Sequence, residues 1–177
     1  MMDRSGSERV RTERIEAGEG GMRPNVARLF DFWLRIGGGT TPERAAVDPV
    51  DLKDILPNLM LVEFTPAPFR VRYRLTGTFV DQQTGLNLTG RYLDEFCHGD
   101  GRDSVQQLID GYRLCAETGR PYHGVYEWPT VHGYPRQIGF GLFPLLVGGR
   151  VTQALSIEDY SDITPDIHLT NWVAPVR

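Results

Sequence analysis

Residues 122–160 read YHGVYEWPTVHGYPRQIGFGLFPLLVGGRVTQALSIEDY, a stretch with three apolar runs and two short turns. The runs cover 122–130, 136–146 and 150–160, and the turns lie at 132–133 and 148–149. Short connections that contain glycine usually join neighbouring antiparallel strands. This part of the chain therefore predicts a three-stranded antiparallel meander.

Two further strands are predicted ahead of the meander. In the segment RVRYRLT, residues 70–76, arginines alternate with Val71, Tyr73 and Leu75. A period of two is typical of a half-buried strand, so we expect these three apolar side chains to face the core. The apolar run at 59–64, bounded by prolines, predicts the fifth strand.

Helical spacing marks the segments that connect the strands. We expect Asp103 or Ser104 to cap the longest helix. The apolar stripe of that helix is Val105, Leu108, Ile109, Tyr112 and Cys115. A second stripe, which ends before a glycine run at 37–39, is Val26, Leu29, Phe30, Trp33 and Leu34. Helices packed on an antiparallel sheet make an α+β arrangement.

Composition narrows the functional classes. The chain has 177 residues, 40% of them hydrophobic, and a net charge of −4, which disfavours general nucleic-acid binding. No run approaches the roughly twenty apolar residues of a membrane span, and residues 1–23 lack an apolar signal core. We therefore expect a cytoplasmic protein. Cys97 and Cys115 are too few for a disulfide framework.

Five short motifs, taken in order along the chain, resemble those of the PAS domain. They are LTGRYLDEF at 88–96, CHGD at 97–100, ETGRPY at 117–122, VHGYPR at 131–136 and DIT at 162–164. The amino-terminal half also resembles a group of short proteobacterial PAS proteins, on the motifs FW at 32–33, PERA at 42–45, DP at 48–49, LP at 56–57 and YRLTGT at 73–78. The resemblance implies a five-stranded antiparallel sheet with helices on one face and an amino-terminal flanking helix. It would form a domain at 25–164, between a flexible tail at 1–24 and a second tail at 165–177.

The resemblance also implies a standalone sensory or adaptor module in bacterial signal transduction. PAS proteins often hold heme, flavin or a small organic acid between the sheet and the long helix. The inward-facing aromatic residues expected to line such a pocket are Tyr73, Phe79, Tyr112, Tyr126, Trp128 and Phe140. Core packing is the alternative role for each of them.

Two cofactors are disfavoured, and the identity of the ligand stays open. The heme-binding members of the family use a His on the long helix, and residues 103–118 contain none. The photosensing flavin proteins need a reactive Cys in an Asn-Cys-Arg-Phe-Leu-Gln-like run, which Cys97 lacks. No metal site is expected, because neither His98 with its neighbouring aspartates nor His123 with His132 has the spacing of a zinc site.

No catalytic residue is assigned, and two other functions remain open. One is a small α+β enzyme with His98 or His123 as general base, which a buried His beside a carboxylate would favour. The other is a purely structural dimerisation module.

The expected partners are proteins. The apolar stripe of the amino-terminal helix predicts a homodimer through Leu29, Phe30 and Trp33. Only thirteen residues follow Thr164, so we expect any signal to reach a separate protein in trans, with Trp172 as an aromatic anchor.

Overall fold

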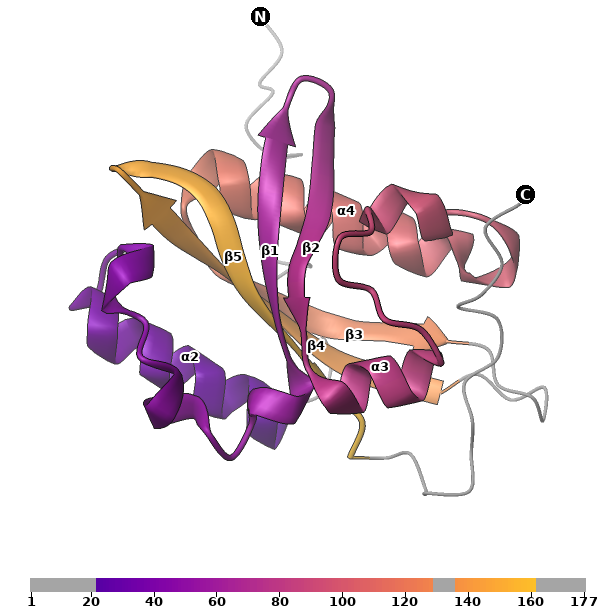
Figure 1. The fold of residues 1–177 in the computed structure, drawn as a ribbon, viewed down its shortest axis with the longest axis horizontal. Coiled ribbons are helices and arrows are strands. Elements are labelled where there is room, and N and C mark those ends of the chain that lie inside the picture. The colour runs from indigo at the N-terminus through magenta and orange to yellow at the C-terminus, as the bar shows by residue number, and fades with distance from the viewer. Residues whose placement is uncertain (1–21, 129–135, 162–177) are drawn as a thin grey trace, which may run out of the picture.

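The predicted five-stranded antiparallel sheet is confirmed. The computed structural model describes residues 22–128 and 136–161 (Figure 1). The strands are β1 (Leu59–Pro66), β2 (Phe69–Thr76), β3 (Tyr122–Trp128), β4 (Arg136–Val147) and β5 (Arg150–Asp159). They lie in the order β2-β1-β5-β4-β3, so the segment 59–66 pairs with both 69–76 and 150–159. The strand β5 thus occupies the centre of the sheet.

Helices cover both faces of this sheet. The α-helices are α2 (Pro24–Gly37), α3 (Thr78–Thr84) and α4 (Arg102–Thr118). The short 3-10 helices are η1 (Arg44–Ala46), η2 (Pro49–Leu52), η3 (Leu56–Asn58), η4 (Leu93–Phe96) and η5 (Gly99–Gly101). One core forms between the sheet, α3 and α4, and a second core forms between the opposite face and α2. Figure 1 shows α2 and α4 on opposite sides of the sheet.

The apolar side of α2 packs against the chain's own sheet. Leu29 and Trp33 are 0% and 4% exposed, and the indole Nε1 of Trp33 donates a hydrogen bond of 2.7 Å to the carbonyl oxygen of Pro144 on β4. The helix ends where Gly38 adopts a left-handed conformation with φ of 57°. This terminus agrees with the glycine run that predicted it.

The predicted cap of the long helix is wrong. The helix α4 begins at Arg102, and Gly101 occupies the N-cap position without a side-chain hydrogen bond. A side chain at Gly101 would collide with the ring of Trp128. The hydroxyl of Ser104 instead donates a hydrogen bond of 2.5 Å to the carbonyl oxygen of Glu127, which ties the start of α4 to β3.

The prediction for β2 is correct for Val71 and Tyr73, which are buried, and wrong for Leu75, which is 53% exposed. The register between β1 and β2 shifts after Leu61, so that Arg74 is an extra residue on β2. An extra residue reverses the alternation of side chains beyond it. Leu75 is therefore on the solvent side of the sheet edge.

Among the residues that the structure describes, no helix is long and apolar enough to cross a membrane.

Candidate functional site

The six aromatic residues predicted to line a pocket come together in one core. They are Tyr73 on β2, Phe79 on α3, Tyr112 on α4, Tyr126 and Trp128 on β3, and Phe140 on β4. All of them except the half-buried Phe79 are buried. The ring centroid of Tyr126 lies 6.3 Å from that of Trp128 and 5.8 Å from that of Phe140. The inward orientation expected from the sequence is thus observed, whereas their role in ligand binding stays a prediction.

A carboxyl group that the sequence reasoning missed lies in the middle of this cluster. Glu158 on β5 is 4% exposed and is the register partner of Phe140 on β4. Its Oε1 accepts a hydrogen bond of 2.8 Å from the hydroxyl of Tyr126, and its Oε2 accepts one from the hydroxyl of Tyr160. The period of two along β5 carried the signal, because it places Glu158 on the same face as Ala154.

Burial sets the protonation of this group of residues. It raises the pKa of Glu158 above its usual 4.5, and the hydrogen bonds from Tyr160 and Tyr126 offset part of that rise. Burial, followed by the nearby negative charge of Glu158, also raises the pKa of Tyr126 and of Tyr160 well above 10. The two tyrosines therefore stay neutral and act as hydrogen-bond donors.

Two more tyrosine hydroxyls lie close to this carboxyl group. The hydroxyl of Tyr112 donates a hydrogen bond of 2.7 Å to Oγ of Ser156 on β5. Tyr73 is 2% exposed, and burial followed by the proximity of Tyr112 and Glu158 raises its pKa well above 10. Within 22–128 and 136–161 the hydroxyl of Tyr73 makes no hydrogen bond.

The residues considered for cofactor and metal binding are dispersed. Both cysteines are free thiols, and burial raises the pKa of Cys115 to about 12, which makes it unreactive. Nε2 of His98 is buried and has no hydrogen-bond partner in the described part of the chain. His123 is half-buried on β3, and His132 lies outside the described residues. No group of three potential metal ligands occurs among the described residues.

A buried His beside a carboxylate would favour the enzyme alternative. His98 does not form that arrangement, because its buried Nε2 contacts no hydrogen-bonding group among the described residues.

The residues predicted to contact a partner differ in how far they are buried. Leu29 and Trp33 pack into the core between α2 and the sheet, because the sheet itself covers the apolar stripe. Phe30 is half-buried and retains part of its surface. Trp172 lies outside the described residues.

Comparison with known families decides the classification. The family model for the PAS domain matches residues 22–116, which is more than half of the chain. This chain belongs to the PAS domain family. The match spans α2, β1, β2, α3 and most of α4. PAS domains are generally sensory, non-catalytic domains, and this membership supports a sensory signalling module.

The solved structures that are similar to this PAS chain include the following three. VqmA bound to DPO is 16% identical with a TM-score of 0.46, and the likeness covers 65% of this chain and 57% of that one. An RNA-binding light-oxygen-voltage receptor is 20% identical with a TM-score of 0.40, covering 59% and 30%. A sensory box histidine kinase/response regulator from Burkholderia thailandensis is 16% identical with a TM-score of 0.39, covering 65% and 86%. No curated protein has a significant match to the sequence.

Proposed function

We propose that this PAS domain is a sensor for a small organic molecule that binds among its interior aromatic residues. The observation that carries the proposal is the buried carboxyl group of Glu158. It is held by the hydroxyls of Tyr126 and Tyr160, beside the Tyr73 hydroxyl, which makes no hydrogen bond within the described residues.

This arrangement is costly for a core that serves packing alone. Burying a carboxyl group in apolar surroundings costs free energy even when it is hydrogen-bonded. Groups whose pKa values are shifted by burial concentrate at functional sites. The unused donor of Tyr73 complements a ligand acceptor such as a carbonyl oxygen, while the rings of Tyr126 and Phe140 offer apolar surface. The expected ligand therefore has an apolar body and a hydrogen-bond acceptor.

The central strand offers a route from this site to the opposite face. Ser156 and Glu158 face the aromatic core, whereas the alternate residues Leu155 and Ile157 pack beneath α2. A ligand that shifts β5 would move side chains on both faces, because the two sets alternate along one backbone. We propose that α2 transmits the signal.

The partner of α2 is proposed to be a second copy of the chain, and a separate signalling protein is proposed to bind the resulting dimer in trans. Phe30 and Leu34 lie four residues apart and share one side of α2, where Leu34 is exposed. Light scattering of the wild type and of Leu34→Glu tests this point. We expect a dimer that the substitution weakens, while Leu75→Glu, at an exposed site on β2, leaves it intact. A monomeric wild type at high micromolar concentration would contradict the dimer.

The ligand proposal is tested by native mass spectrometry of the purified full chain, together with an absorbance scan. We expect a bound small-molecule mass on the wild type that is lost or reduced in Tyr73→Phe. This substitution removes one hydroxyl that makes no hydrogen bond in the described structure, so the fold should persist. Tyr92→Phe is the matched control, since Tyr92 is a half-buried tyrosine outside the interior cluster, with the guanidinium of Arg70 over its ring. A wild type without bound mass, or equal occupancy in Tyr73→Phe, would refute the proposal.

A further inference from the structure

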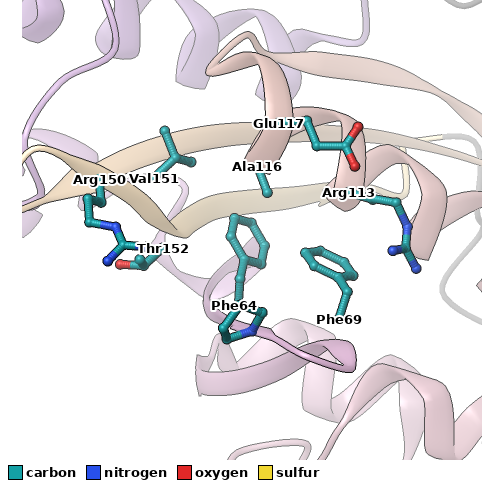
Figure 2. A pocket seen from close by; sticks show the side chains of 9 residues that line it. Phe64, Phe69, Arg113, Ala116, Glu117, Arg150, Val151 and Thr152 are labelled. Carbon is teal, nitrogen blue, oxygen red and sulfur yellow. The ribbon is translucent and has the colours of Figure 1, made fainter.

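A second pocket lies at the other end of the central strand. It is formed where the β1–β2 hairpin, the carboxyl-terminal part of α4 and the start of β5 meet, and its volume is about 410 Å³. That volume is within the usual range of small-molecule sites. Its lining residues are Phe64, Pro66, Phe69, Arg113, Ala116, Glu117, Arg150, Val151 and Thr152 (Figure 2).

The middle of the pocket is apolar. The rings of Phe64 and Phe69 lie with their centroids 5.6 Å apart and tilted by 34°. Figure 2 shows both rings between α4 and β5, with Ala116 and Val151 on the far side. Such a surface suits the hydrocarbon or aromatic part of a ligand.

Two cations at this pocket, Arg113 and Arg150, form no ion pair with any residue that the structure describes. Other arginines of the chain form ion pairs with carboxylates, among them Arg28, Arg35, Arg70, Arg72, Arg74 and Arg91. In the described residues Arg113 and Arg150 form none, although Glu117 follows Arg113 by one helical turn. An arginine side chain is always charged. Arg113 and Arg150, taken together with the carboxylate of Glu117, therefore leave a net charge of about +1 at the pocket. The charge favours an anionic ligand.

The two ends of the pocket differ. At one end the guanidinium of Arg113 stacks over the ring of Phe69, with its carbon 4.7 Å from the ring centroid, and Glu117 lies nearby. At the other end Figure 2 shows Arg150 beside the hydroxyl of Thr152, with no acidic side chain among the labelled residues there. The end with Arg150 therefore suits an anionic group better than the end with Glu117.

The backbone of β5 is irregular at this end. Leu145 pairs with Gln153, whereas Leu146 pairs with Val151, so Thr152 is an extra residue on β5. A bulge of this kind re-aims side chains, and bulges are frequent beside functional sites. It lets the consecutive residues Val151 and Thr152 both line the pocket.

We propose that this pocket binds a small monoanionic carboxylate with an apolar body. The carboxylate would accept hydrogen bonds from the guanidinium of Arg150 and the hydroxyl of Thr152, and the apolar body would cover Phe64 and Phe69. Charge-assisted hydrogen bonds between a guanidinium and a carboxylate are the strong class in proteins.

The pocket lies at the edge of the interior cluster, away from Glu158. Thr152 and Glu158 are six residues apart on β5, which corresponds to about 20 Å along an extended strand. Phe64 forms part of the wall between the two places, because its ring centroid lies 5.9 Å from that of Tyr112 on the interior side. A molecule in one place would therefore leave the other free.

The test uses 3-phenylpropionate and hexanoate as probes, with 3-phenylpropanamide as the uncharged match of the first. Binding to the full chain is followed by two-dimensional amide NMR, which reports both affinity and location. We expect shifts confined to residues around 64–69, 113–117 and 150–152. The dissociation constant should rise about tenfold or more in Arg150→Gln and for the amide probe. Thr152→Val should weaken binding to a smaller extent.

Two control variants keep the result interpretable. Arg120→Gln removes an exposed arginine outside the pocket and should bind the probes as the wild type does. Tyr73→Phe alters the interior site and should also leave probe binding unchanged, so failure of one proposal is distinguishable from failure of the other. The pocket proposal is overturned by absence of shifts up to about 10 mM probe. It is equally overturned by equal binding of acid and amide, by unchanged binding to Arg150→Gln, or by shifts centred on the interior cluster.

Discussion

The hydroxyl of Tyr112 on α4 donates a hydrogen bond of 2.7 Å to Oγ of Ser156 on β5, and both side chains are buried. This bond joins the long helix to the central strand within a largely apolar core. Along β5, Ser156 lies between Thr152 at the proposed pocket and Glu158. On the pocket side, the ring of Tyr112 contacts that of Phe64. The bond is therefore expected to stabilise the packing of α4 on the sheet.

Removing the Tyr112 hydroxyl should lower stability. Tyr112→Phe leaves the buried hydroxyl of Ser156 without this partner, so the free energy of unfolding should fall by about 1–3 kcal/mol. The combination of Tyr112→Phe with Ser156→Ala should cost less than the sum of the two single changes. Urea unfolding of the four proteins measures the coupling, and strict additivity would show that the bond is not formed.

The raised pKa of Glu158 predicts that the difference in stability between the wild type and Glu158→Gln depends on pH. The folded-state pKa is raised above 4.5, so above pH 4.5 the unfolded chain loses this proton before the folded chain does. The folded state then binds more protons, and this residue's contribution to stability falls as pH rises towards the raised pKa. The stability of wild type minus that of Glu158→Gln should therefore decrease as the pH rises above about 4.5. Denaturant unfolding at pH 4 and pH 7.5 compares the pair. A difference that grows with pH would contradict the raised pKa.

The buried apolar side of α4 predicts a large loss of stability when one of its side chains is truncated. Leu108→Ala removes a buried side chain between α4 and the sheet and should cost about 2–4 kcal/mol. Gln106→Ala, on the exposed side of the same helix, should change stability by no more than about 0.5 kcal/mol. Thermal and urea unfolding measure both, and a loss below about 0.5 kcal/mol for Leu108→Ala would show that the helix packs differently.

The bulge at Arg74 is tested by truncating two apolar residues of β2, one on each side of it. Val71→Ala should lower the free energy of unfolding by about 1.5–3 kcal/mol, because Val71 is buried. Leu75→Ala should change it by about 0.5 kcal/mol or less, because Leu75 is on the solvent side. Similar losses for both variants would mean that the alternation continues without a bulge.

The strands and helices could be predicted because their signals are local. The period of two in 70–76 and the helical spacing in 105–115 depend only on which residues stand two, three or four positions apart. The glycine run at 37–39 likewise ends α2 through the conformation of one residue, Gly38. Motif order then indicated the PAS family, which the match over 22–116 shows.

The position of Leu75 could not be predicted in the same way. The sequence continues its alternation through Arg74, and the bulge exists only because β2 must pair with β1 in one register. The glycine before α4 could not be predicted either, because the ring that leaves no room for a side chain at Gly101 is that of Trp128, on the distant strand β3.

The candidate site was likewise predictable only in part. Its aromatic members were identifiable from alternation within single strands and helices. The hydrogen bond between Glu158 and Tyr126 joins residues 32 positions apart, on β5 and β3, which are separated in the sheet by β4. The carboxyl group is buried among side chains from several elements, so its raised pKa is a property of the assembled core. Local spacing determined which side chains face inward, and tertiary packing decided which of them meet and what charge they carry.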